Sequence, residues 1–143
     1  MKIILVLFVT LLVGNNCQDQ INQDLITAKI EYVANTRGFY AKTVVENKTL
    51  SLTTERDGKS ESSALTDSQL SSLIAAFEKV NLEEIPNLKA PSQKRFHDGA
   101  AMANLKITYK GKTYESQTFD HGNPPEKIKK IVNILLSFSK KEE

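Results

Sequence analysis

The chain has 143 residues, 40% of them hydrophobic, and its 19 basic side chains nearly balance 17 acidic ones. The formal net charge of +2 argues against nucleic acid as a partner, because binding to a polyanion needs many positive charges on one face. The length suits a single domain with one hydrophobic core.

The first residues have the pattern of an export signal. Lys2 is followed by the apolar run Ile3–Val13, which is shorter than the ~20 residues that a membrane-spanning helix needs. We therefore expect residues 1–16 to be a signal peptide that takes no part in the fold. Its removal leaves 18 basic and 17 acidic side chains.

Cys17 is the only cysteine of the chain and directly follows this segment. Its position resembles that of the lipid-modified cysteine of bacterial lipoproteins, although Asn16 and Gly14 depart from the usual small residue and leucine before that cysteine. We expect lipidation and membrane anchoring at the cell envelope, with secretion as a soluble protein or an uncleaved anchor as alternatives. Residues 17–24 are polar and unpatterned, and they predict a tether to a single domain over residues 25–143.

Hairpins are predicted in the first half of this domain. Hydrophobic residues alternate with polar ones from residue 25 to Tyr32, and aromatic and β-branched residues are frequent over 39–46, so both segments read as strands. A tight turn at Asn47-Lys48 leads to a third strand over 49–55. The Asp57-Gly58 pair predicts another hairpin turn, with 60–64 returning as a weak, polar edge strand.

The hydrophobic period then changes to that of a helix. Thr66 and Gln69 fit a capping box, and the apolar spacing predicts a helix from about Asp67 to Val80. A long irregular connection follows. The residues expected to anchor this connection are Ile85, Leu88 and Phe96.

A second hairpin and a last helix complete the pattern. Alternation over 101–109, a turn at Lys110-Gly111 and a return strand over 112–119 form the hairpin. Asn123 is the expected cap of the final helix, ahead of two prolines. The order β-β-β-β-α-β-β-α predicts an α+β fold, a two-layer sandwich of a mostly antiparallel sheet with two helices on one face.

Both histidines of the chain lie beside an aspartate and a glycine. If Lys110-Gly111 is a two-residue turn, Gly99 lies opposite Gly122, Ala100 opposite His121 and Ala101 opposite Asp120. The motifs His97-Asp98-Gly99 and Asp120-His121-Gly122 should then meet at the open end of the hairpin.

These loops allow two interpretations. His97, Asp98, Asp120 and His121 could ligate zinc, which takes nitrogen and oxygen ligands. However, neighbouring residues on an extended backbone point to opposite faces. The structural interpretation, which we favour, is that the glycines adopt backbone angles closed to other residues and the aspartates accept backbone hydrogen bonds.

Catalysis lacks a recognisable signature. No serine lies in a G-x-S-x-G elbow, and the chain has no phosphate-binding glycine loop, metal-binding helix motif or C-x-x-C pair. We expect a protein without enzymatic activity or cofactor, and a hydrolase with an unrecognised site remains a less favoured alternative.

The turn of the first hairpin is a candidate partner-binding tip. Arg37, Gly38, Phe39 and Tyr40 combine arginine with two aromatic residues, types that are enriched at binding hot spots. The alternative is that Phe39 and Tyr40 alternate along the strand, with one packing on the core and one on the surface.

Several stretches together resemble the small emfourin-like proteins, a family that includes inhibitors of thermolysin-type metalloproteases. They are "RGFY", "LTDSQLSSLIAAF", "LKAPSQKRFHDGA" and "PPEKIKKIVNIL", spread over about residues 26–138. Arg37-Gly38-Phe39 stands where the family pattern would have Gly-Gly-Phe. The resemblance implies a small α+β fold and, as a function, inhibition of an exported protease, and no inhibitory residue is carried over from it.

The sequence thus predicts a bacterial envelope lipoprotein whose domain binds a protein partner. A ligand- or metal-binding domain that uses the His97 and His121 loops is the second hypothesis.

Overall fold

The computed structural model describes residues 27–140. The predicted signal peptide, Cys17, the tether and the start of the first strand lie outside the described residues. The elements follow the order β1 (Lys29–Asn35), β2 (Tyr40–Glu46), β3 (Thr49–Thr53), β4 (Glu61–Ala64), α2 (Asp67–Phe77), the 3₁₀ helices η1 (Leu82–Asn87) and η2 (Lys94–His97), β5 (Met102–Tyr109), β6 (Lys112–Glu115), β7 (Phe119–Asp120), the 3₁₀ helix η3 (Glu126–Ile128) and α3 (Lys129–Phe138).

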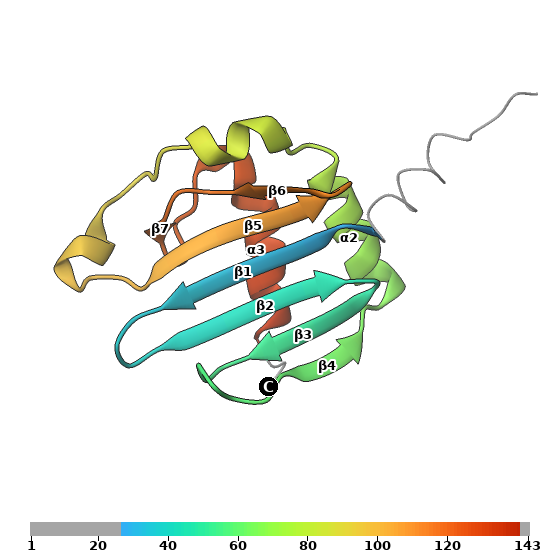
Figure 1. Cartoon of the computed structure of the whole chain (residues 1–143), viewed down its shortest axis with the longest axis horizontal. Helices are drawn as coiled ribbons and strands as arrows, with labels where there is room; N and C mark the ends of the chain where they lie inside the picture. The colour runs from blue at the N-terminus through green and yellow to red at the C-terminus, as the bar shows by residue number, and fades with distance from the viewer. Residues whose placement is uncertain (1–26, 141–143) are drawn as a thin grey trace, which may run out of the picture.

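The strands form one sheet in the order β4-β3-β2-β1-β5-β6, and β7 also pairs with β5. All of these pairings are antiparallel. Helix α3 crosses one face of the sheet, and α2 packs beside it on the same face (Figure 1). The predicted α+β class and the layering of helices on one face are confirmed. Among the described residues, none of the helices is long and apolar enough to cross a membrane.

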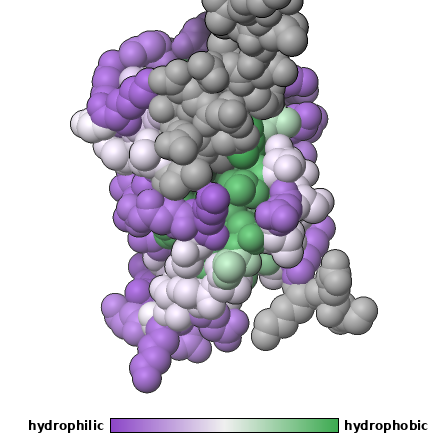
Figure 2. Space-filling model, turned by 90° about the vertical axis from the view of Figure 1, so that its right-hand side faces the viewer, coloured by the Kyte–Doolittle hydropathy of each residue, from purple (hydrophilic) through white to green (hydrophobic). Residues whose placement is uncertain are grey.

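The core lies between the two layers because each strand turns alternate residues toward the helices. In β1, Ile30, Tyr32 and Ala34 are at most 1% exposed. On the other face Glu31 lies among three lysines, with its carboxylate 3.3 Å from Lys42 Nζ. Figure 2 shows the hydrophobic residues as a band with hydrophilic surface on either side, as expected for a two-layer molecule.

The predicted tight turns are confirmed by their backbone angles. Asn47 and Lys48 have φ of 50° and 62°, and Lys110 and Gly111 have φ of 48° and 77°. Two successive positive φ values give a turn whose twist matches that of the flanking strands. The predicted edge strand is also confirmed, because β4 pairs only with β3 among the described strands and all four of its residues are exposed.

Helix α2 begins as predicted. The Thr66 side chain accepts a hydrogen bond from the Gln69 N–H, and the Gln69 side chain accepts one from the Thr66 N–H. The helix ends at Phe77 rather than Val80, because the N–H groups of Lys79 and Val80 bond to carbonyls three residues earlier. Bonds of this kind tighten a helix end into a 3₁₀ turn.

The long connection after α2 is anchored only in part as expected. Ile85 is fully buried in η1, and Leu88 packs against the core. The prediction for Phe96 was wrong, since its side chain is 58% exposed. Its ring instead lies 4.2 Å from the Arg95 guanidinium carbon, which occupies the ring face.

The predicted cap of the last helix was also wrong. A residue that precedes proline is disfavoured in helical backbone, so Pro124, which precedes Pro125, is a poor first helical residue after an Asn123 cap. The helical turn begins only after Pro125, as η3, and α3 follows from Lys129. The Asn123 side chain instead donates a hydrogen bond to Ser92 Oγ at 2.7 Å.

The last hairpin contains a β-bulge that the sequence analysis did not predict. The expected register holds from the Tyr109–Lys112 pair to the Lys106–Glu115 pair, but Met102 then pairs with Asp120, where Ala101 was expected. The predicted partner of Asp120 is therefore wrong by one residue, and β7 ends at Asp120, so His121 and Gly122 lie in the turn that follows the strand. Two residues of the return strand, Gln117 and Thr118, stand opposite one residue of β5.

The bulge has a clear physical cause. Tyr114 and Ser116 are buried, so strict alternation would bury Thr118 and expose Phe119. The extra residue reverses this outcome. Phe119 is fully buried and packs 6.2 Å from the ring of Tyr32, while Gln117 and Thr118 remain exposed.

Candidate functional site

Asp120 joins the return strand to the loop that carries η2. Its carboxylate accepts hydrogen bonds from Ser92 Oγ at 2.5 Å and from the backbone N–H groups of Lys94 and Arg95 at 2.8 and 3.0 Å. The Arg95 guanidinium adds an ion pair at 3.1 Å, with the two side chains 7% and 2% exposed. The two predicted loops therefore do lie side by side.

The electrostatics of Asp120 follow from these contacts. Burial alone would raise the pKa of this carboxyl. The hydrogen bonds from Ser92, from the two backbone N–H groups and from the Arg95 side chain outweigh burial and hold the pKa well below its usual range. Asp120 is thus a permanently charged structural anchor, as the structural interpretation of the loop expects.

The first loop has a different arrangement. Asp98, and not Gly99, occupies the left-handed region, with φ of 56°. Gly99 lies close to η2, and a Cβ there would make a tight contact, 3.2 Å from the Lys94 carbonyl oxygen. In the second loop Gly122 has φ of 81°, as predicted. His97 is the last residue of η2 and is exposed.

His121 points toward the helix side of the sheet, away from the Asp120 network. Its Nδ1 lies 2.8 Å from Tyr32 Oη, and its ring centroid lies 5.3 Å from that of Phe39. Burial raises the pKa of Tyr32 to about 12, although the Gly122 N–H partly offsets this. Burial also lowers the pKa of His121. We therefore assign His121 as the neutral imidazole that carries its proton on Nε2. Its Nδ1 then accepts a hydrogen bond from the Tyr32 hydroxyl.

The four predicted ligand residues do not form a metal site. Within residues 27–140, no group of three or more His, Cys, Asp or Glu side chains could hold a metal ion. Asp120 and His121 point to opposite sides of their strand, as expected for neighbours on extended backbone. The zinc hypothesis therefore has no ligand set in this part of the chain.

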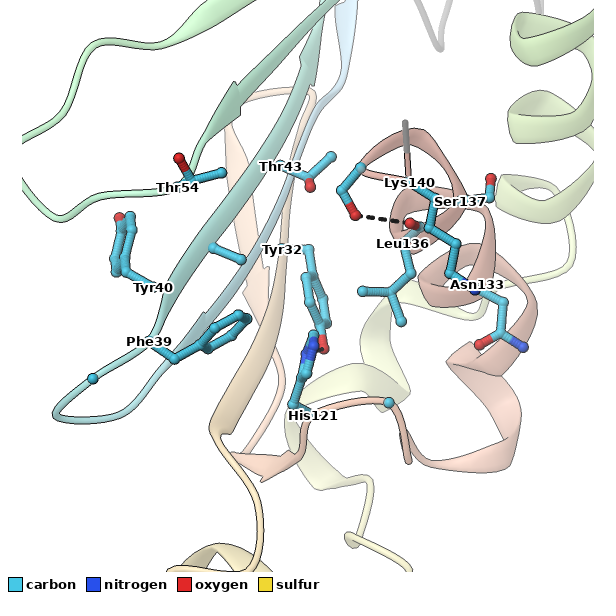
Figure 3. Close-up of a pocket in the computed structure, with 14 residues that line it drawn as sticks. Tyr32, Phe39, Tyr40, Thr43, Thr54, His121, Asn133, Leu136, Ser137 and Lys140 are labelled. Atoms are coloured by element: carbon cyan, nitrogen blue, oxygen red, sulfur yellow. Dashed lines mark hydrogen bonds between the residues drawn. The ribbon is translucent and has the colours of Figure 1, made fainter. Parts of the chain in front are cut away.

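Next to His121 is a cleft of about 770 Å³, between the sheet and the C-terminal part of α3. We call it the aromatic cleft. From the sheet side it is lined by Tyr32, Phe39 and His121, and from the helix side by Asn133 and Leu136 (Figure 3). Its volume is in the range of ligand-binding pockets. Lys140 is the only charged side chain among the described residues that line it.

The residues of the predicted tip do not all line this cleft. Gly38 and Phe39 line it, and Phe39 points toward His121 while remaining 42% exposed. Tyr40 contributes to the lining as well, but alternation along β2 places its side chain on the face of Lys42 rather than that of Ala41. Arg37 lines a different cavity. A Cβ at Gly38 would meet no atom within 4 Å, so this position has room for a side chain.

The helix side of the cleft has no signal in the sequence. Asn133 is a polar residue on the exposed part of an amphipathic helix and carries no motif. Leu136 is one of several apolar residues of the same helix and has no distinguishing pattern around it. Its proximity to Phe39 depends on where α3 crosses the sheet, and a crossing angle leaves no local signal in the sequence.

Comparison of the chain with protein-family models, with curated protein sequences and with solved structures gave no match. The resemblance to emfourin-like proteins therefore stays a prediction.

Proposed function

We propose that the chain is a non-enzymatic binding module of the bacterial cell envelope. Its aromatic cleft accepts a hydrophobic side chain of an exported protein partner. The observation that carries this proposal is the partly exposed Phe39 ring at the mouth of the cleft, next to two further aromatic rings. An aromatic pocket beside a projecting turn is a typical hot-spot arrangement.

The side chains around the cleft support binding rather than hydrolysis. A hydrolytic serine needs a base within hydrogen-bond reach. The hydroxyls of Ser137 and Ser139 instead donate to helix carbonyls, those of Ile134 and Leu136. The Nδ1 of His121, the ring nitrogen that would serve as a base in our tautomer assignment, is engaged by Tyr32.

The first residues of the sequence support the proposed localisation at the cell envelope. A signal-like segment that ends just before a lone cysteine is the pattern of a lipid-anchored envelope protein. In that compartment the available partners are themselves exported. An exported protease is the partner that the emfourin-like resemblance implies.

Affinity capture from envelope extract tests the proposal when variants of the cleft are compared. The bait is the full chain, purified in mild detergent, as wild type, Phe39→Ala and Asn133→Trp. Phe39→Ala removes the aromatic mouth, and Asn133→Trp fills the cleft from an exposed helix position. Ser68→Trp, on the exposed part of α2, is the matched control.

We expect wild type and Ser68→Trp to capture at least one protein in similar amounts. The amount captured by each of the two cleft variants should be lower by about tenfold or more. A metalloprotease among such proteins would support the inhibitory role. If the captured set is the same for all four baits, the cleft is not the binding site.

A further inference from the structure

A second cavity, of about 530 Å³, lies on the other side of the β1–β2 turn. We call it the arginine cavity because Arg37, Arg56 and Arg95 all line it. They come from the β1–β2 turn, the β3–β4 turn and η2, which lie at the same end of the sheet (Figure 1). Asp98 is the only acidic residue in its lining among the described residues.

Two of these arginines are held in place by the fold. Arg56 Nη2 donates to the Thr36 carbonyl at 2.6 Å. Arg95 uses Nη1 for Asp120 and for the Ser92 carbonyl, and Nε for Thr118. Its Nη2 has no partner among the described residues, and none of the buried side-chain nitrogens of residues 27–140 lacks one, so this Nη2 is not fully buried.

The third arginine has no partner in the described part of the chain. Arg37 makes neither a hydrogen bond nor an ion pair within residues 27–140, and it lies in an exposed turn. The ion pair with Asp120 balances Arg95 alone. Asp98 offsets one of the two remaining charges, so Arg37 and Arg56 leave one positive charge in excess around the cavity. A guanidinium fork suits an anion with two oxygens.

The two cavities are neighbours along the chain. Thr36 and Arg37 line the arginine cavity, and the next residues, Gly38 and Phe39, line the aromatic cleft. Because successive Cα atoms are about 3.8 Å apart, a short peptide lying over the turn reaches both. Met102, which is 41% exposed, gives the arginine cavity an apolar wall as well.

We infer that the partner segment is acidic: it places an Asp or Glu side chain in the arginine cavity while its hydrophobic side chain enters the aromatic cleft. This inference rests on the proposed function, because it assigns the chemistry of the same partner. The carboxylate supplies acceptor oxygens to Arg37 and to the N–H groups of Arg56 that do not bond to the Thr36 carbonyl.

Selection of random octapeptides displayed on phage tests this inference without a known partner. The target is the immobilised full chain, as wild type, Arg37→Gln/Arg56→Gln and Asn133→Trp. Peptides joined to the coat protein by their C-termini have no free terminal carboxylate, so any acidic preference must come from side chains. Lys79→Gln/Lys89→Gln, which removes two exposed charges outside both cavities, is the matched control.

We expect peptides selected on wild type to combine an aromatic or aliphatic residue with a nearby Asp or Glu. Their affinity should fall about tenfold with Arg37→Gln/Arg56→Gln and stay unchanged with the lysine control. Arg37→Gln alone breaks no contact within residues 27–140 and should give part of this loss. Melting curves of each variant check that the fold is kept.

The outcomes separate the inference from the proposed function. Hydrophobic peptides without an acidic preference, or acidic peptides that bind Arg37→Gln/Arg56→Gln as well as wild type, would overturn the inference alone. If peptides are enriched on wild type no more than on Asn133→Trp, both the inference and the proposed function are overturned.

Discussion

At the scale of single residues, Asp120 holds the segment that leads into η2 against the sheet. One carboxylate satisfies two backbone N–H groups, a hydroxyl and a guanidinium, all from the segment 92–95. That segment has little apolar anchorage of its own, because Phe96 points outward. The position of η2, and with it one side of the arginine cavity, therefore depends on this side chain.

We expect Asp120→Ala to lower the free energy of unfolding by about 3 kcal/mol or more, because it leaves the Arg95 guanidinium buried without its counter-charge. Urea denaturation followed by circular dichroism measures this loss. Glu46→Ala, which removes an exposed carboxylate, should change stability by no more than about 0.5 kcal/mol. A loss below about 1 kcal/mol for Asp120→Ala would show that the network is not needed for stability.

His121 should make stability depend on pH. Burial lowers its pKa in the folded protein below the ordinary value of 6.5, so the unfolded chain binds the proton more tightly. Its contribution to the free energy of unfolding is therefore fully present above that ordinary value. It decreases as the pH falls through 6.5 toward the lower folded pKa.

Denaturation at several pH values from about 8 to 5 measures this dependence. The stability difference between wild type and His121→Phe, which cannot titrate, should shrink or change sign as the pH falls. His97→Gln is the control and should keep the wild-type profile. Parallel profiles for wild type and His121→Phe would contradict the lowered pKa.

At the scale of elements, the turn between β2 and β3 has a residue that does not suit its backbone conformation. Lys48 has φ of 62°, a conformation that costs a residue with a side chain roughly 1 kcal/mol. Asn-Gly is the preferred pair for such turns. Lys48→Gly should therefore raise the free energy of unfolding by about 0.5 kcal/mol, and Lys48→Ala should not; thermal melting compares them. Equal melting temperatures for both variants would argue against backbone strain at this turn.

The elements that local chemistry determines could be predicted from the sequence. The alternation in β1, the capping box at Thr66 and the turn at Lys110-Gly111 each depend on residues close together in the chain, and each is confirmed. The bulge could not be predicted in the same way. It results from competition between the turn, which sets the register, and the burial of Phe119, which overrides that register eight residues after Gly111.

The candidate site was predictable only as separate pieces. Phe39 and His121 were both singled out, but for different hypotheses, a binding tip and a ligand loop. Their ring contact depends on the placement of β7 beside β5 and on the bulge. No residue pattern near either one indicates the other.

At the scale of the whole molecule, the predicted anchor would limit where the cleft can act. Eleven residues lie between Cys17 and Lys29, where β1 begins, and this stretch can span at most about 40 Å of extended chain. A lipid-anchored domain would therefore meet its partners close to the membrane surface.

Lipidation is tested directly at Cys17. We expect mass spectrometry of the purified protein to show diacylglycerol at this residue, and fractionation to place the protein with membranes. In Cys17→Ser both the added mass and the membrane association should be lost. A wild-type protein that is unmodified and freely soluble would favour secretion instead.

The bulge at Gln117 and Thr118 decides which way the two ionisable residues after it point. In a strictly alternating strand of the same length, the carboxylate of Asp120 would face Tyr32 and the imidazole of His121 would face the guanidinium of Arg95. A buried cation would then lose its partner and an apolar pocket would gain a charge. Deleting Gln117 or Thr118 would remove the bulge and keep the present directions of both side chains, so we expect this short segment to tolerate the loss of one residue.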